Sequence, residues 1–277
     1  MKLICLGDSW ARGSDLIDPT SLDVGIDWMA TQRLTGHTAY RIKHRYITLL
    51  ANRLQAELID LTTPGCSNDT ITRNLLNYLA VEGYLSGEKM VTELMISIGW
   101  TAPERRDFYY PGINNLTSDH PEYGWFTIQP SCLRSYSGLD LIDFQKFYAS
   151  TLVQSEEYMY RYISQVYHTQ TMLKSLGIKF FMHQAFYDEN IFHQHRDKLS
   201  FNSNAGNPVE ILWNQIDCST FINKNDLESP TFKAYITIQA KKLNQRVFDK
   251  EYECYHPNAF GHQLWCDYIY QFFANKR

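Results

Sequence analysis

Two short segments at opposite ends of this 277-residue sequence hold residue types that can carry out nucleophilic chemistry. Gly7-Asp8-Ser9 follows the first apolar run, and Glu253 and His256 lie near the C-terminus. A serine hydroxyl attacks a carbonyl poorly until a base removes its proton, and histidine suits that task near neutral pH. A carboxylate three residues earlier can fold back to the other ring nitrogen and orient the imidazole. The segments therefore predict Ser9 as nucleophile, His256 as base and Glu253 as the orienting carboxylate.

Each segment taken alone has a simpler interpretation. The serine tripeptide can be a helix cap, and His256 before Pro257 can stand at the start of a helix. Asp249 and Glu251 are further carboxylates near the histidine, so they are alternatives to Glu253. The catalytic interpretation therefore depends on a fold that brings both ends of the chain together.

The expected strands and helices provide such a fold. Short apolar runs bounded by turn residues predict buried parallel strands at residues 2–6, 57–61, 92–98 and 178–181. Apolar residues at helical spacing predict helices at residues 39–58, 68–79, 143–176, 233–247 and 260–275. Strands that alternate with helices indicate an α/β fold with a mainly parallel sheet, which binds ligands outside the carboxyl ends of its strands. Ser9 is expected at that edge.

Two stretches interrupt the alternation, near residues 102–140 and 187–230. Both contain prolines and aromatic residues without a helical or strand period. The first is expected to be a long functional loop or a small insertion over the cleft, and the second an insertion or a lid. Because no repeat or low-complexity linker divides the chain, residues 1–277 are expected to form one domain with two insertions.

Composition and charge exclude several other classes of protein. The formal net charge is −4 and the pI about 6.1, so a nucleic-acid-binding surface is not expected. The short basic clusters at residues 41–45 and 104–106 are expected to be solvated. The apolar runs are too short for a membrane span or a secretory signal, which predicts a cytoplasmic protein without membrane contact. The six cysteines lack Cys-x-x-Cys spacing, and neither metal nor cofactor is expected.

The motifs and their order resemble those of the SGNH (GDSL-like) hydrolase family. That family carries Gly-Asp-Ser after strand one, a glycine after strand two, Gly-x-Asn-Asp after strand three and Asp-x-x-His near the C-terminus. The matching positions here span nearly the whole chain and are Gly7-Asp8-Ser9, Gly65, Glu253-x-x-His256, Pro257 and Gly261-His262. The resemblance implies a flavodoxin-like three-layer α/β/α sandwich with a mainly parallel sheet and a serine nucleophile.

The oxyanion hole is where the sequence departs from the family. The third block reads GWTA at residues 99–102, whereas the family's asparagine lends a side-chain amide there. The resemblance assigns the other donors to the main-chain amides of Ser9 and Gly65. The Thr101 hydroxyl or the Asn68 amide can take the missing place, and losing one donor typically costs about 3 kcal/mol. The second departure, Glu253 for aspartate, lengthens the side chain by one methylene and keeps its role.

Three further residues are candidates for contact with a substrate. Trp10 follows the nucleophile directly, and Trp100 can form an apolar or sugar-stacking wall or else pack in the core of an insertion. His183 follows the fourth expected strand, where it can face the cleft or be a buried, hydrogen-bonded histidine.

The residues and the resemblance together predict a metal-independent serine esterase for a small-molecule or glycan ester. The family's usual substrates and the polar, aromatic insertions favour the O-acetyl groups of a carbohydrate. A glycan-binding module with little or no catalysis and an O-acyltransferase are the two alternatives. Residues 99–105 (GWTAPER) also resemble phage-encoded SGNH-like proteins, which would place the protein in a virion or a host cell.

Overall fold

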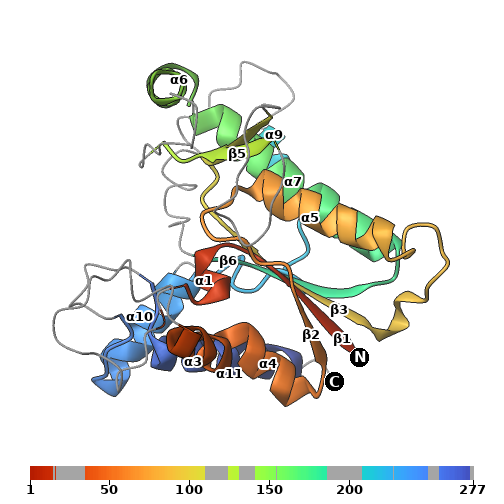
Figure 1. Ribbon diagram of the computed structural model, residues 1–277, viewed down its shortest axis with the longest axis vertical. Coiled ribbons are helices and arrows are strands. Elements are labelled where there is room, and N and C mark those ends of the chain that lie inside the picture. The colour runs from red at the N-terminus through yellow and green to blue at the C-terminus, as the bar shows by residue number, and fades with distance from the viewer. Residues whose placement is uncertain are drawn as a thin grey trace.

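The centre of the molecule is a four-stranded parallel sheet in the order β2-β1-β3-β6 (Figure 1). A computed structural model describes residues 1–14, 16, 35–109, 124–130, 141–153, 155–185, 208–226, 228–248 and 256–274. The strands are Lys2–Leu6 (β1), Glu57–Asp60 (β2), Leu94–Trp100 (β3) and Lys179–Gln184 (β6). All three neighbouring pairs run parallel. The four predicted strands and the α/β class are therefore confirmed.

Helices cover both faces of the sheet, because side chains along each strand alternate between two apolar clusters. Ile4 and Leu6 join one cluster, and Leu3 and Cys5 join the other. The first face carries α5 (Asn68–Val81), α7 (Ser155–Ser175) and α9 (Pro208–Gln215). The second carries α4 (Tyr46–Leu54), α10 (Phe232–Leu243) and α11 (Ala259–Ala274), with α3 (Thr35–His44) beside α4 and α11. Figure 1 shows these two groups of helices on opposite sides of the sheet.

The helix predicted over residues 39–58 is broken into α3 and α4 at Arg45. This residue is extended, and its buried guanidinium lies 2.5 Å from Asp60 Oδ2 and 3.0 Å from Thr48 Oγ1. Burial raises the pKa of Asp60, but the charge of Arg45 and the hydrogen bonds of Thr62 outweigh it and lower that pKa. The expectation of a solvated cluster is therefore wrong for Arg45, which turns inward to a carboxylate.

The helix predicted over residues 143–176 is interrupted as well. It consists of α6 (Ile142–Phe147), a π-helical turn at Tyr148–Leu152 and α7. The turn places Tyr148 in a small apolar cluster with Phe126 and Ile128 of the first insertion. The break thus serves to pack the insertion.

The described part of the first insertion is an antiparallel hairpin of β4 (Arg106–Tyr109) and β5 (Trp125–Ile128). Asp107 fastens it to the start of α5. Its carboxylate accepts hydrogen bonds from the hydroxyls of Ser67 and Thr70, both at 2.6 Å, and pairs with Arg73 at 3.0 Å. The insertion is therefore tied to the loop that leads into α5.

Residues 208–222, predicted within an insertion or a lid, belong to the core. Val209 and Trp213 of α9 pack in the same cluster as α7. The main chain of Met182 in β6 exchanges two 2.8 Å hydrogen bonds with Thr220 and Ile222, which extends the edge of the sheet. The lid interpretation is therefore wrong for this part of the segment.

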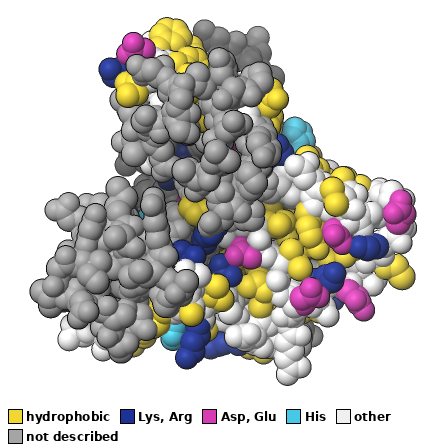
Figure 2. All heavy atoms as spheres, in the orientation of Figure 1, with side chains coloured by type: hydrophobic (Ala, Val, Ile, Leu, Met, Phe, Trp, Pro, Cys, Tyr) yellow, Lys and Arg dark blue, Asp and Glu magenta, His cyan; other side chains and the backbone are white. Residues whose placement is uncertain are grey.

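The described surface mixes both charge signs. Acidic and basic side chains lie interspersed on the described part of the face in Figure 2. Large exposed apolar side chains include Val81 and Met90. Within the described residues, no helix combines the length and apolar character needed to cross a membrane.

Candidate active site

Ser9 lies at the carboxyl edge of the sheet, where the strand order changes direction. β2 lies on one side of β1 and β3 on the other, so the chain connections that follow β1 and β3 lead away to opposite sides. Open parallel sheets bind ligands in the crevice at such a switch point. Ser9 follows β1 and Thr101 follows β3, so both lie where a ligand is expected.

The turn that presents Ser9 requires glycine at position 7. Gly7 has a φ of +155°, and a Cβ built there would lie 2.7 Å from the Cβ of Ala11. This close approach lets the chain turn at once into α1 (Ser9–Arg12). Asp8 caps that helix, with Oδ1 accepting the main-chain N–H of Trp10 at 3.0 Å. Ser9 is therefore the first residue of a single helical turn and is partly exposed.

His256 reaches Ser9 from the other end of the sequence. The loop before α11 is fixed by Asn258, whose main-chain N–H donates to the Val247 carbonyl at 2.8 Å. Its side-chain oxygen accepts the N–H of Gly261 at 3.0 Å, which caps α11. A 2.7 Å hydrogen bond then joins His256 Nε2 to Ser9 Oγ. The predicted nucleophile and base are thus in direct contact.

Trp10 packs behind the imidazole of His256. Their ring centroids are 5.8 Å apart, and Trp10 also contacts the rings of Phe232 and Phe248. Because Trp10 is buried, it holds the imidazole in place and offers little surface to a substrate. Its predicted role in substrate binding is therefore replaced by contact with the base.

The predicted orienting carboxylate cannot be placed against this pair. Glu253 lies outside the described residues, as do its alternatives Asp249 and Glu251. The third member of the triad stays a prediction.

The loop after β2 lies beside the Ser9 turn. The Thr63 N–H donates to the Gly7 carbonyl at 2.9 Å, and Cys66 Sγ donates to the same oxygen at 3.7 Å. Gly65 lies between these contacts, with a φ of +68°. In the described part of the chain, the main-chain N–H groups of Ser9 and Gly65 donate no hydrogen bond to the protein. Two such amides beside a nucleophile are what an oxyanion hole requires, so both stay predicted donors.

The two candidates for the third donor differ. The Thr101 hydroxyl donates its single hydrogen to Asp8 Oδ2 at 2.7 Å, so the prediction that it serves an oxyanion is wrong in this arrangement. The Asn68 amide pairs with the main chain of Thr101, accepting its N–H at 2.9 Å and donating to its carbonyl at 3.2 Å. An amide carries a second hydrogen, so Asn68 stays a predicted donor.

The structure adds a buried ion pair that sequence reasoning missed. Arg105 Nη1 lies 3.3 Å from Asp8 Oδ2, and both side chains are buried. The expectation of a solvated cluster at residues 104–106 is therefore wrong for Arg105, whereas Arg106 pairs with Glu157 at the surface. Spacing gave no signal for the pair, because the two partners are 97 residues apart in the sequence.

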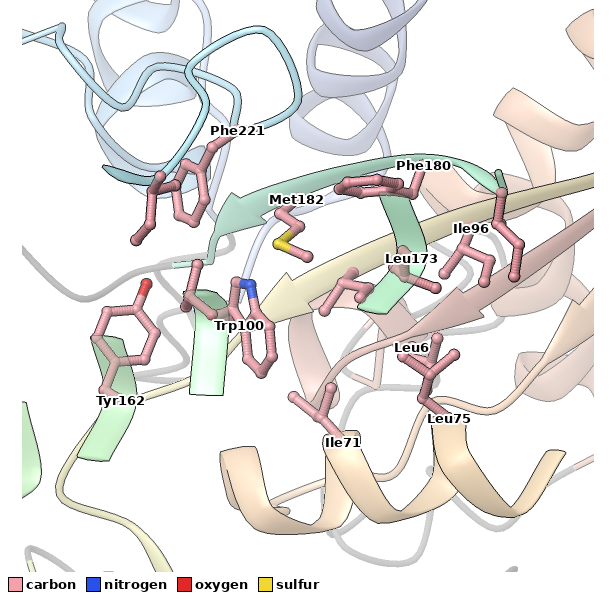
Figure 3. Close-up of a cluster of buried hydrophobic side chains, with 14 of the residues drawn as sticks. Leu6, Ile71, Leu75, Ile96, Trp100, Tyr162, Leu173, Phe180, Met182 and Phe221 are labelled. Atoms are coloured by element: carbon pink, nitrogen blue, oxygen red, sulfur yellow. The ribbon is translucent and has the colours of Figure 1, made fainter. Parts of the chain in front are cut away.

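Trp100 belongs to the core and does not line a cleft. It is fully buried in β3, and its ring meets that of Tyr162 at a centroid distance of 6.3 Å. Figure 3 shows Trp100 among Tyr162, Met182 and Phe221. Its predicted contact with a substrate is therefore wrong, and Trp100 packs in the core on one face of the sheet and not in the core of the insertion.

His183 is also buried, which decides between its two predicted roles. Its Nε2 lies 3.0 Å from the Tyr46 hydroxyl, and its ring packs against Trp265 at 5.2 Å. Burial lowers the pKa of His183 to about 3, so the ring is neutral near pH 7. The substrate-binding prediction gives way to the alternative of a buried, hydrogen-bonded histidine.

His262 is a second buried histidine, close to the base. Its Nδ1 accepts the Tyr46 N–H at 3.3 Å. Burial, followed by electrostatic interactions with His256 and Arg45, lowers the pKa of His262 to about 3. The ring is therefore a neutral hydrogen-bond acceptor near pH 7.

The thiol of Cys66 contacts the turn that carries Ser9. Burial and the charge of Asp8 raise the pKa of the Cys66 thiol well above its usual value, so this neighbour stays protonated. Among the residues that the structure places, no group of three or more His, Cys, Asp or Glu is arranged to hold a metal ion.

Comparison with known proteins identifies a family but no activity. A family model described as a family of unknown function (DUF6071) matches residues 29–268. The chain belongs to this family. The DUF6071 match includes Gly65 and His256 and begins after Ser9. No curated protein matches the sequence.

Proposed function

We propose that the protein is a serine esterase of the SGNH type, with Ser9 as nucleophile and His256 as base. The observation that carries the proposal is the 2.7 Å hydrogen bond between Ser9 Oγ and His256 Nε2. Its position at the switch point of a parallel sheet supports a ligand-binding role for the same edge. The order of the motifs supports an SGNH form of the three-layer α/β/α fold.

The proposed reaction has two halves. Ser9 Oγ attacks the ester carbonyl while His256 Nε2 takes the hydroxyl proton, which gives a tetrahedral intermediate. The bond from the carbonyl carbon to the alkoxy oxygen then breaks, and His256 protonates the leaving alcohol. Water repeats the sequence on the acyl-enzyme, with His256 as base, and releases the carboxylic acid and free Ser9.

The developing negative charge needs donors that are already in position. The main-chain amides of Ser9 and Gly65 supply two in this proposal, and the second amide hydrogen of Asn68 supplies the third. Glu253 orients the imidazole and stabilises its charged form, as the resemblance implies. A hole that lacks the Thr101 hydroxyl depends more strongly on Asn68.

The proposed substrate is the O-acetyl ester of a carbohydrate. This choice rests on the SGNH resemblance and on the aromatic and polar residues of the two insertions. An acetyl group is small and needs only a small pocket on the acyl side, so the sugar would supply most of the contacts.

Ester hydrolysis by purified wild type and Ser9→Ala tests the proposal. Removing the nucleophile of a serine hydrolase typically lowers kcat by about a millionfold, leaving only slow residual catalysis. We therefore expect no p-nitrophenyl acetate turnover above background in Ser9→Ala. Ser175→Ala is the matched control, because Ser175 Oγ donates to the Met172 carbonyl at the exposed end of α7. Equal turnover in wild type and Ser9→Ala would contradict the assignment.

The engaged hydroxyl of Thr101 favours a second candidate, a glycan-binding module with weak catalysis. Glycan-array binding that survives Ser9→Ala, without ester hydrolysis by wild type, would support it. An O-acyltransferase is separated from a hydrolase by product analysis: an acylated sugar acceptor forms in place of free acetate.

A further inference from the structure

We propose that Arg105 is a positioning residue that holds the nucleophile and the oxyanion donors in one arrangement. The inference rests on the proposed esterase function and adds a residue to it. A single nitrogen of its guanidinium, Nη1, meets three loops of the site. It lies 2.8 Å from Thr101 Oγ1, 3.2 Å from the Cys66 carbonyl oxygen and 3.3 Å from Asp8 Oδ2.

Each of these three acceptors is linked to one part of the proposed machinery. Asp8 precedes Ser9 and caps its helical turn. Cys66 follows Gly65, so its carbonyl belongs to the same loop as that oxyanion amide. Thr101 is paired through its main chain with the Asn68 amide, the proposed third donor. A shift of Arg105 would therefore move the Gly65 and Asn68 donors relative to Ser9.

The main chain around Arg105 is fixed by hydrogen bonds from a neighbouring helix. The Arg105 carbonyl and that of Pro103 accept hydrogen bonds from Arg161 Nη2 of α7, at 3.2 and 2.9 Å. The main-chain N–H of Arg105 donates to the Ala102 carbonyl at 3.2 Å. The turn that carries Arg105 is thus anchored to a long helix on one face of the sheet, which gives the guanidinium a fixed base.

Stability alone gives a weak reason for this ion pair. Asp8 is fully buried and Arg105 nearly so. Burying two charges costs desolvation energy that their attraction often fails to repay, and apolar replacements are often as stable. A buried donor nitrogen does what an apolar residue cannot, because Nη1 contacts three separate acceptors at once and so fixes their relative positions.

Two substitutions of Arg105 are expected to lower turnover to different extents. Arg105→Lys keeps a positive charge for Asp8, but the ammonium stands on a flexible stem and lacks the rigid, planar guanidinium that holds Nη1 in place. Arg105→Gln also removes the charge. Misplacing catalytic groups by about 1 Å costs about 100-fold. We expect turnover per active site to fall about 100-fold for Arg105→Gln and about 10-fold for Arg105→Lys, with KM changing less than about twofold.

The neighbouring arginine provides the matched control. Arg106 forms a half-exposed pair with Glu157 at 3.2 Å, whereas the hydrogen bonds to the side chains of Asp8 and Thr101 and to the Cys66 carbonyl come from Arg105. Arg106→Lys and Arg106→Gln make the same chemical changes one position away. Their turnover per site is expected to stay within about twofold of wild type, because exposed ion pairs contribute little.

Counting active sites separates positioning from folding. Each variant is labelled to completion with a fluorophosphonate, and p-nitrophenyl acetate turnover is divided by the labelled fraction. A purely structural role lowers the labelled fraction and leaves turnover per labelled site unchanged. A positioning role lowers turnover per labelled site, as the proposal requires.

Thr101→Val is the second variant, in case Arg105→Gln does not fold. It removes the hydroxyl between Asp8 and Arg105, keeps the ion pair and nearly keeps the side-chain volume. We expect about a 10-fold loss of turnover per site. Wild-type turnover per site in both Arg105→Lys and Thr101→Val overturns the role of Arg105 and leaves the esterase proposal intact. A wild type that neither hydrolyses the ester nor takes the label overturns both.

Discussion

His256 and His183 show how the same side chain acquires opposite properties in two neighbouring regions. His256 is partly exposed at the sheet edge and bonds to a serine hydroxyl. His183 is buried among Tyr46, Trp265 and Phe232, and burial lowers its pKa to about 3. A histidine exchanges protons near neutral pH only where its charged form is tolerated. The comparison therefore gives His183 a structural role and leaves the proposed chemistry at the edge.

The interior region supports the edge through Tyr46. This residue contacts His183 through its hydroxyl and His262 through its main-chain N–H. His262 lies in α11, directly after the loop that carries His256. The two neutral histidines therefore help to fix α4 and α11, and with them the position of the base.

The largest effect on ester turnover is expected from replacing His256, the proposed base at the sheet edge. His256→Ala should lower ester turnover by about 10⁴-fold or more, because the serine loses its proton acceptor. Kinetics with p-nitrophenyl acetate measure the loss. The control is His168→Ala, since His168 is exposed on α7 and its loss should leave turnover within about twofold. Equal activity in His256→Ala and His168→Ala would remove His256 from the chemistry.

The next effect is the loss of stability in acid. The unfolded chain protonates histidine below the ordinary pKa of 6.5, whereas folded His183 and His262 resist protonation down to about pH 3. The contribution of these two histidines to the free energy of unfolding is therefore fully present above about pH 6.5 and is lost as the pH falls toward 3. At pH 5 each histidine should cost about 2 kcal/mol of unfolding free energy.

Urea unfolding at pH 7.5 and pH 5 measures this loss. His183→Gln should lose less stability than wild type between the two pH values, by about 2 kcal/mol. The exposed control His168→Gln should behave as wild type. The same pH dependence in all three proteins would show that His183 is not a buried neutral group.

The smallest effect concerns the link between the regions. Tyr46→Phe removes the hydroxyl that meets His183 and leaves a buried ring nitrogen without that partner. We expect a loss of about 1–3 kcal/mol in urea unfolding, with turnover of the folded enzyme near that of wild type. Tyr270→Phe is the control, because Tyr270 is exposed on α11. Equal stability of the two variants would mean that the Tyr46 hydroxyl contributes nothing.

The sequence predicted the features that depend on local patterns. Apolar runs located all four strands of the sheet, and the glycine before Asp8 indicated the turn at Ser9. The contact between Ser9 and His256 followed from placing both segments at one sheet edge. Such features could be predicted because periodicity and turn chemistry act over a few neighbouring residues.

The features that escaped prediction depend on distant partners. Arg45 breaks a helical pattern to reach Asp60, and Arg105 reaches Asp8 across 97 residues. Both arginines have the local sequence of a solvated cluster, and only the folded chain supplies their carboxylates. Trp100 is the last residue of β3, and from the sequence alone it could have faced either a cleft or the core. Burial by other elements decided the outcome in each case.

Covalent labelling with a fluorophosphonate tests the central claim, that Ser9 is a nucleophile activated by His256, most directly. Intact mass and peptide mapping identify the modified residue. We expect one label per wild-type chain, located on Ser9, no label on Ser9→Ala, and labelling of His256→Ala slowed at least about 1,000-fold. A label on another residue, no label on wild type, or an unchanged labelling rate in His256→Ala would contradict the account.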